Sequence, residues 1–216
     1  MTPNIIDVLQ GSEEWMAARV GKVSASRIAD MTAKTKSGYS TSRANYAAEL
    51  VAERLTGVKA EKFVSGPMAH GVENEAAART MYEFMHNVNV TEVGLVLHPT
   101  IDMSCASPDG LVGDDGLIEI KCPLTSTHIE TLRGGSIDGK YIKQMQWQMA
   151  CTGRLWCDYV SFDPRMPGDM QVHIQRVPRD GVMIVELERE VRAFLAEVDE
   201  TLDQLVSRYR TEAAAE

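Results

Sequence analysis

The chain has 216 residues, of which 44% are hydrophobic and 25% are charged, and this composition is sufficient to bury one sizeable core. Its 22 basic and 31 acidic residues give a formal net charge of −9, which excludes a protein that coats nucleic acid indiscriminately. The charge does not exclude an enzyme that acts on DNA, because a basic groove can be local while the remaining surface is acidic.

The sequence has no apolar run of the length needed to cross a bilayer, and its N-terminus lacks the basic and then apolar pattern of a secretory signal. We therefore expect a soluble, intracellular protein without membrane contact. Its length favours a single domain over residues 1–216.

Helical spacing of apolar residues and alanine predicts three helices in the first third of the chain, over residues 12–19, 24–33 and 41–56. Ser24 and Thr41 are the expected N-caps, and Gly57 is the expected end of the third helix. The polar segment 34–40 predicts a loop.

A fourth helix is predicted over residues 70–86, and the pattern then changes to short β-branched or apolar runs at 92–98, 103–107, 111–112 and 117–121. Further elements follow as helices at 126–132 and 139–151, strands at 156–162 and 170–176, and an amphipathic helix at 182–209. This order predicts an α/β fold with a central mixed β-sheet flanked by helices.

Three charged residues are expected to converge in the middle of this sheet. Asp109 precedes one strand, and the turn at 113–116 would return the next strand alongside it, so that Asp109 lies near Glu119. Glu119 and Lys121 are two residues apart in a strand and therefore share a face. Two carboxylates suit Mg²⁺ or Mn²⁺, and a neighbouring lysine could orient or deprotonate water, because metal charge and partial burial lower an ammonium pKa.

Spacing alone leaves an alternative open for these residues. They could form an exposed hairpin in which Glu119 and Lys121 make a weak surface ion pair and Asp109 is only a turn residue.

The four cysteines contain no Cys-x-x-Cys pair, which argues against a zinc ribbon. We expect small buried thiols, with an iron–sulfur cluster built from all four as the alternative. They are Cys105, Cys122, Cys151 and Cys157.

The sequence resembles the viral-recombinase (YqaJ-like) exonuclease family, which includes phage lambda exonuclease and whose nuclease core belongs to the PD-(D/E)xK superfamily. The most informative matches are Ser107-Pro108-Asp109-Gly110-Leu111 and Glu119-Ile120-Lys121-Cys122-Pro123. Further collinear matches lie at residues 1–3, 15–19, 24–26, 75–84, 87–92, 141–149 and 163–166. The resemblance implies a restriction-endonuclease-like core.

The resemblance also implies roles in metal binding. Asp109, Glu119 and the backbone carbonyl of Ile120 would bind Mg²⁺, for which Mn²⁺ may substitute, and Lys121 would activate the attacking water. Glu75 would support a second ion, so that two ions stabilise the attacking and leaving oxygens. The alternative for Glu75 is a solvated helix face.

Arg19, Ser26 and Ser107 match family positions that hold a 5′-terminal phosphate, for which a guanidinium fork and hydroxyl donors are chemically suited. The alternatives are a surface ion pair for Arg19 and capping or buried hydroxyls for the serines.

The helix at 139–151 places Tyr141, Gln144 and Gln148 on one face, and the resemblance assigns Gln144, and then Tyr141, to DNA near the scissile bond. Met68 lies in the region of an apolar wedge that separates the end of the duplex, with ordinary core as the alternative. Lys36 lies near a position that contacts DNA.

The function implied is a Mg²⁺-dependent 5′→3′ exonuclease that digests one strand of linear double-stranded DNA from a 5′-phosphate end. It would leave 3′ overhangs for phage-type recombination, in the cytoplasm of a bacterial host. Family membership further implies a ring-shaped homotrimer and a single-strand annealing recombinase as partner. The alternatives are a structure-specific or restriction-type endonuclease and a degenerate DNA-binding module.

Overall fold

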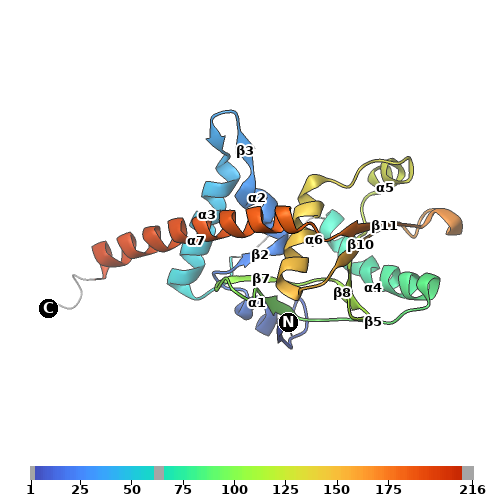
Figure 1. The fold of residues 1–216 in the computed structure, drawn as a ribbon, viewed down its shortest axis with the longest axis horizontal. Helices are drawn as coiled ribbons and strands as arrows, with labels where there is room; N and C mark the ends of the chain where they lie inside the picture. Colours follow the sequence, from blue (N-terminus) through green and yellow to red (C-terminus); the bar gives the residue numbers. More distant parts are fainter. Residues whose placement is uncertain (1–2, 61–65, 211–216) are drawn as a thin grey trace.

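Helices surround two main β-sheets in the computed structural model, which describes residues 3–60 and 66–210 without the side chains of Pro67 and Met68 (Figure 1). The five-stranded sheet has the order β11-β10-β9-β8-β5, with bounds Val172–Pro178, Trp156–Phe162, Gly116–Lys121, Gly110–Val112 and Val90–Thr91. The four-stranded sheet has the order β1-β6-β7-β2, with bounds Asn4–Ile6, Leu95–Leu97, Ser104–Ala106 and Val23–Ser24. Parallel and antiparallel pairs occur in both sheets, so the predicted mixed α/β fold is confirmed.

The strand predicted over 92–98 forms only at its centre, as β6, and β5 of the other sheet ends just before the predicted range. Gly94 lies against the N-terminal segment, where an added Cβ would be 2.2 Å from the carbonyl oxygen of Val8. Because only a glycine fits this close approach, the chain can leave β5 and enter β6 at this point.

The seven α-helices of the described residues are α1 (Glu13–Ala18), α2 (Ile28–Thr32), α3 (Thr41–Thr56), α4 (Gly66–His86), α5 (Thr125–Leu132), α6 (Gly139–Thr152) and α7 (Gly181–Tyr209). Two 3₁₀ turns, η1 (Ala25–Arg27) and η2 (Gly168–Met170), complete the helical elements there. The predicted end of α3 is confirmed, because its C-cap Gly57 has φ +71°. Ser40, rather than Thr41, is its N-cap.

The helix predicted over 24–33 is wrong in its first part. Val23 and Ser24 form β2, which pairs with β7 in parallel, and only then do η1 and α2 follow. Ser24 occupies the N-cap position of η1 but makes no side-chain capping bond. Tertiary pairing overrides local helical propensity here.

The segment 34–40 is ordered as a hairpin of β3 (Lys34–Thr35) and β4 (Gly38–Tyr39), where a loop was predicted. The hairpin projects beside α3 in Figure 1, and the Tyr39 hydroxyl donates to Glu190 of α7 at 2.5 Å. Lys34 pairs with the same carboxylate at 3.2 Å.

Helices α4 and α6 cover opposite faces of β9. Ile118 and Ile120 pack with Ala78 and Tyr82 of α4. The alternating residues face α6, and Leu117 belongs to the larger core that α6 and α7 complete. No helix among the described residues is long and apolar enough to span a membrane.

Candidate active site

The β8–β9 hairpin brings Asp109 to the middle of β9. Antiparallel pairing of Gly110 with Ile118 places Asp109 beside Glu119, and Asp109 Oδ2 accepts a hydrogen bond from the Ile120 backbone N–H at 2.6 Å. The position of Asp109 is therefore set by strand register and by a bond to the neighbouring strand.

Glu119 is fully buried and is held by three side chains. Lys121 Nζ pairs with its Oε1, Gln144 Nε2 donates to Oε1 at 2.6 Å, and Gln148 Nε2 donates to Oε2 at 2.6 Å. An exposed hairpin with a surface ion pair is therefore wrong for this chain. Gln144, which the resemblance assigns to DNA, contacts Glu119, a candidate metal ligand, in this structure.

Charges at the site are incompletely compensated. Burial and the charges of Glu119 and Glu75 raise the pKa of Asp109 well above its usual range, despite the opposing effects of Lys121 and the Ile120 N–H. The pKa of Lys121 is also raised, because the attraction of Glu119 and Asp109 outweighs burial, which alone would lower it. From the sequence we expect burial to lower the pKa of this ammonium group, and that expectation is wrong for the protein without a bound metal.

Glu75 lies on α4 at the edge of the same site. Its carboxylate pairs with Arg79 at 2.8 Å, and Arg79 also pairs with Glu92 at 2.8 Å. Burial, with the charges of Glu119 and Glu92, raises the pKa of Glu75. It is only partly exposed, so it is not the fully solvated residue of the alternative interpretation.

A cavity of 420 Å³ lies beside Glu75 and Lys121. The residues that line it are Gly71, Val72, Glu75, Ile120, Lys121, Cys122, Pro123 and Tyr141. The Tyr141 ring lies 5.2 Å from Lys121 Nζ, so the residue predicted to contact DNA does border the acidic site.

Within residues 3–60 and 66–210, no group of three or more His, Cys, Asp or Glu side chains is arranged to hold a metal ion by itself. An iron–sulfur cluster from the four cysteines is therefore not supported, and all four are buried free thiols, as predicted. A hard cation at Asp109 and Glu119 would need further oxygen ligands, such as the Ile120 carbonyl, water or substrate. Burial and the nearby charges of Glu119 and Glu75 raise the pKa of Asp109, and a cation would offset both effects on the carboxylate, so the residues fit it.

A second polar group lies near the start of the chain. The Arg19 guanidinium stacks over the Trp15 ring at 3.9 Å, and Trp15 Nε1 donates to Ser107 Oγ at 2.9 Å. Burial lowers the pKa of Arg19, and no carboxylate in the described part of the chain forms an ion pair with it. A surface ion pair is thus not what holds Arg19.

Ser26 is exposed and lies just after β2, a strand of the four-stranded sheet. Parallel pairing of Ser24 with Cys105 places the chain that follows β2 beside the chain that follows β7, which carries Ser107. Ser26 Oγ is 3.5 Å from Ser24 Oγ. Since Ser107 precedes Asp109 by two residues, this polar group adjoins the acidic site.

Two other predicted residues are placed less informatively. Lys36 is exposed at the turn of the β3–β4 hairpin. The side chain of Met68, predicted as a wedge, lies outside the described residues.

Sequence reasoning gave no role to three residues that organise the site. Trp15 joins Arg19 to Ser107, and Arg79 pairs with Glu75. Gln10 Nε2 donates to the carbonyl oxygen of Pro108 at 2.9 Å, next to Asp109. A spacing of four residues, which brings side chains together on a helix, could have indicated the contacts of Trp15 with Arg19 and of Glu75 with Arg79.

Comparison with known families gives a decisive match. The model described as the YqaJ-like viral recombinase domain matches residues 14–155. The chain belongs to this family. No curated protein sequence matches it.

Solved structures agree with this membership of the YqaJ-like family. The chain is similar to an alkaline exonuclease from Laribacter hongkongensis, with 52% identity and a TM-score of 0.86, over 93% of this chain and 99% of that one. The complex of that exonuclease with dAMP matches equally well, with the same identity, coverage and TM-score. A phage-related exonuclease from Haemophilus somnus 129PT, at 15% identity and a TM-score of 0.66 over 85% and 96% of the two chains, shares the fold.

Proposed function

We propose that this YqaJ-family protein is a Mg²⁺-dependent exonuclease that digests one strand of linear double-stranded DNA in the 5′→3′ direction. The observation that carries the proposal is the adjacency of two groups: the Asp109–Glu119–Lys121 cluster and the Arg19–Ser107 group, two residues away along the chain. The similarity to an alkaline exonuclease, at 52% identity, supports the assignment of the reaction as exonucleolytic cleavage. The remaining 3′ overhang would serve phage-type recombination.

The metal would be held by Asp109, Glu119 and the Ile120 carbonyl, with Glu75 available for a second ion. When bound, Mg²⁺, or Mn²⁺ in its place, supplies positive charge that offsets the phosphate and eases loss of a proton from water. Gln144 and Gln148 fix the Glu119 carboxylate so that its oxygens keep one orientation.

Lys121 lies between the carboxylates and the cavity, with a quarter of its side chain exposed. Its ammonium can orient an attacking water by hydrogen bonding and offset charge that develops on the scissile phosphate. Tyr141, across the cavity, can contact the nucleotide at that point.

Arg19, Ser26 and Ser107 would hold the 5′-terminal phosphate. A guanidinium that is stacked on an aromatic ring and paired with no carboxylate among the described residues is available for a phosphate. Because this group adjoins the acidic site, holding the terminal phosphate there would present the first phosphodiester to the metal and give digestion its direction.

The test uses matched linear duplexes that differ only in a 5′-phosphate or 5′-hydroxyl, each with Mg²⁺ or with a chelator. We expect digestion only with Mg²⁺, release of mononucleotides from the phosphorylated 5′ end, and much slower attack on the hydroxyl end. Digestion that proceeds in the chelator, or that starts at the 3′ end, would overturn the proposal.

A restriction-type endonuclease with the same metal site is the rival function. Closed circular duplex separates the two, since an exonuclease needs an end. Linearisation of the circle would favour the endonuclease.

We also propose that the protein works as a ring-shaped homotrimer with a single-strand annealing recombinase. A ring is compatible with the net charge of −9, because basic groups can line its channel while the outer surface repels DNA. Light scattering of the purified protein should give the mass of three chains, and a monomer would contradict the ring.

A further inference from the structure

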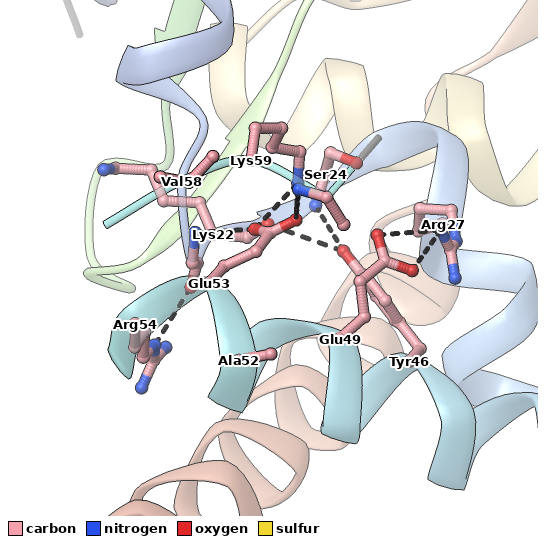
Figure 2. Close-up of polar contacts among 12 residues, drawn as sticks. Lys22, Ser24, Arg27, Tyr46, Glu49, Ala52, Glu53, Arg54, Val58 and Lys59 are labelled. Carbon is pink, nitrogen blue, oxygen red and sulfur yellow. Dashed lines mark hydrogen bonds and ion pairs between the residues drawn. The ribbon is translucent and has the colours of Figure 1, made fainter. Parts of the chain in front are cut away.

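Helix α3 holds the segment that carries Arg19 and Ser24, although α3 contributes no residue to the acidic site. Tyr46, Glu49 and Glu53 lie on one face of α3 at helical spacing i, i+3 and i+7 (Figure 2). Tyr46 and Glu53 turn toward this segment, and Glu49 pairs with Arg27, just after it. The contacts of Tyr46 and Glu53 reach the segment at several positions.

Glu53 is a buried charged residue on this face and is only 1% exposed. Its carboxylate accepts from the Gly21 N–H at 2.8 Å, from Lys59 Nζ at 2.7 Å and from the Ala60 N–H at 3.2 Å. Burial alone would raise the pKa of Glu53, but these donors lower it overall. The carboxylate is thus compensated by donors from two separate chain segments.

Arg54, the next residue of α3, binds the other backbone polar group of Gly21. Its Nε donates to the Gly21 carbonyl oxygen at 3.0 Å, and a Cβ on Gly21 would lie 2.6 Å from Arg54 Cγ. Gly21 has φ +67°, which favours glycine. Both polar groups of Gly21 are therefore held by successive residues of one helix.

Tyr46 binds the backbone of the following residues. Its hydroxyl accepts from the Ser24 N–H at 3.2 Å and donates to the Lys22 carbonyl oxygen at 3.4 Å. The segment between Arg19 and Ser24 is accordingly fixed through its backbone, which leaves the side chain of Arg19 available to a ligand.

We propose that Glu53 is a positioning residue for the terminal phosphate: by holding Gly21, it sets the place of Arg19 and so the preference for a 5′-phosphate over a 5′-hydroxyl end. The inference rests on the proposed exonuclease function. Glu53 is buried and acts through the backbone of this segment. It also binds Lys59 (Figure 2) and the Ala60 N–H, on the chain between α3 and α4.

Two variants disturb the contact from opposite sides. Glu53→Gln removes the charge from the carboxylate, and Gly21→Ala brings a methyl group against Arg54 without changing any buried charge. The matched control is Glu197→Gln. This variant breaks the ion pair between Glu197 of α7 and the buried Arg43 of α3, and Glu197 contacts nothing in residues 19–24.

The measurement is the initial rate on matched linear duplexes with 5′-phosphate or 5′-hydroxyl, with kcat and KM determined for each. We expect both variants to lower the ratio of kcat/KM between the two ends by about tenfold, through a higher KM for the phosphorylated end, since small misplacements of binding groups are costly. The hydroxyl end and the Glu197→Gln ratio should not change. Partial loss of folded enzyme would lower both rates equally and leave the ratio intact.

Two outcomes would overturn the inference, and they differ. If wild type discriminates between the ends and both variants keep its ratio, Glu53 does not position the pocket, while the proposed function stands. If wild type itself digests both ends equally, the phosphate pocket of the proposed function is wrong as well.

Discussion

Asp109 and Glu53 carry carboxylates that their surroundings affect in opposite ways, the first partly buried and the second buried. Burial and neighbouring acidic groups raise the pKa of Asp109, whereas donors from two chain segments lower the pKa of Glu53. The environment of Asp109 has an excess of negative charge, which a cation can offset. The environment of Glu53 is complete without a ligand.

The difference distinguishes a carboxylate suited to the reaction from one that stabilises the structure. A carboxylate that lacks compensation destabilises the fold unless a ligand binds, so its retention indicates a functional site. A carboxylate that collects donors from distant segments fixes the chain. The first cluster should therefore control turnover, and the second should control stability and end preference.

The largest expected effect is at Lys121. Lys121→Met should lower kcat by about a thousandfold, because the group that orients water and offsets phosphate charge is lost. Lys140→Met is the matched control, since both ammonium groups lie over the Tyr141 ring, at 5.2 and 4.7 Å. Steady-state digestion of linear duplex checks it, and equal activity of the two variants would remove Lys121 from the proposed reaction.

Gln148 should have the next largest effect on turnover. Gln148→Met removes a donor from the fully buried Glu119, and we expect kcat to fall by about tenfold because the metal-binding carboxylate loses its orientation. Gln146→Met serves as control: Gln146 is equally buried on the same helix, but it bonds to Pro178 and Asp180. If both variants lost activity alike, the effect would be one of folding.

The sequence predicted the Asp109 cluster well for a physical reason. Its geometry follows from alternation in β9 and from a short turn, both of which spacing reveals. The Glu53 cluster depends on contacts 32 residues apart between a helix and a glycine, which no local pattern encodes. The same limit explains β2, where two residues predicted as the end of a loop and the start of a helix join a sheet instead.

Acid should erase the contribution of Glu53 to stability. Its pKa is lowered on folding, so its stabilisation is present above the unfolded pKa, about 4.3, and is lost as pH falls through the folded value. Glu53→Gln should thus be less stable than wild type by about 2 kcal/mol at neutral pH, with the gap narrowing below pH ~4. Urea unfolding across pH measures the gap. Gly21→Ala changes no titrating group, so its deficit should stay constant, and a constant gap for Glu53→Gln would contradict the assignment.

The smallest expected effect is at Trp15, which joins the two polar groups. Trp15→Phe keeps an aromatic ring beneath Arg19 but removes the Nε1–H that Ser107 accepts. Loss of one hydrogen bond of about 1 kcal/mol should raise KM for the 5′-phosphorylated duplex by about fivefold and leave the hydroxyl-ended duplex unaffected. Trp156→Phe is the control, because Arg176 stacks over that ring at 3.6 Å, away from the pocket. An unchanged KM in Trp15→Phe would mean that the hydrogen bond from Trp15 does not position Ser107. The phosphate pocket would then depend only on the hydrogen bonds from α3 to the backbone.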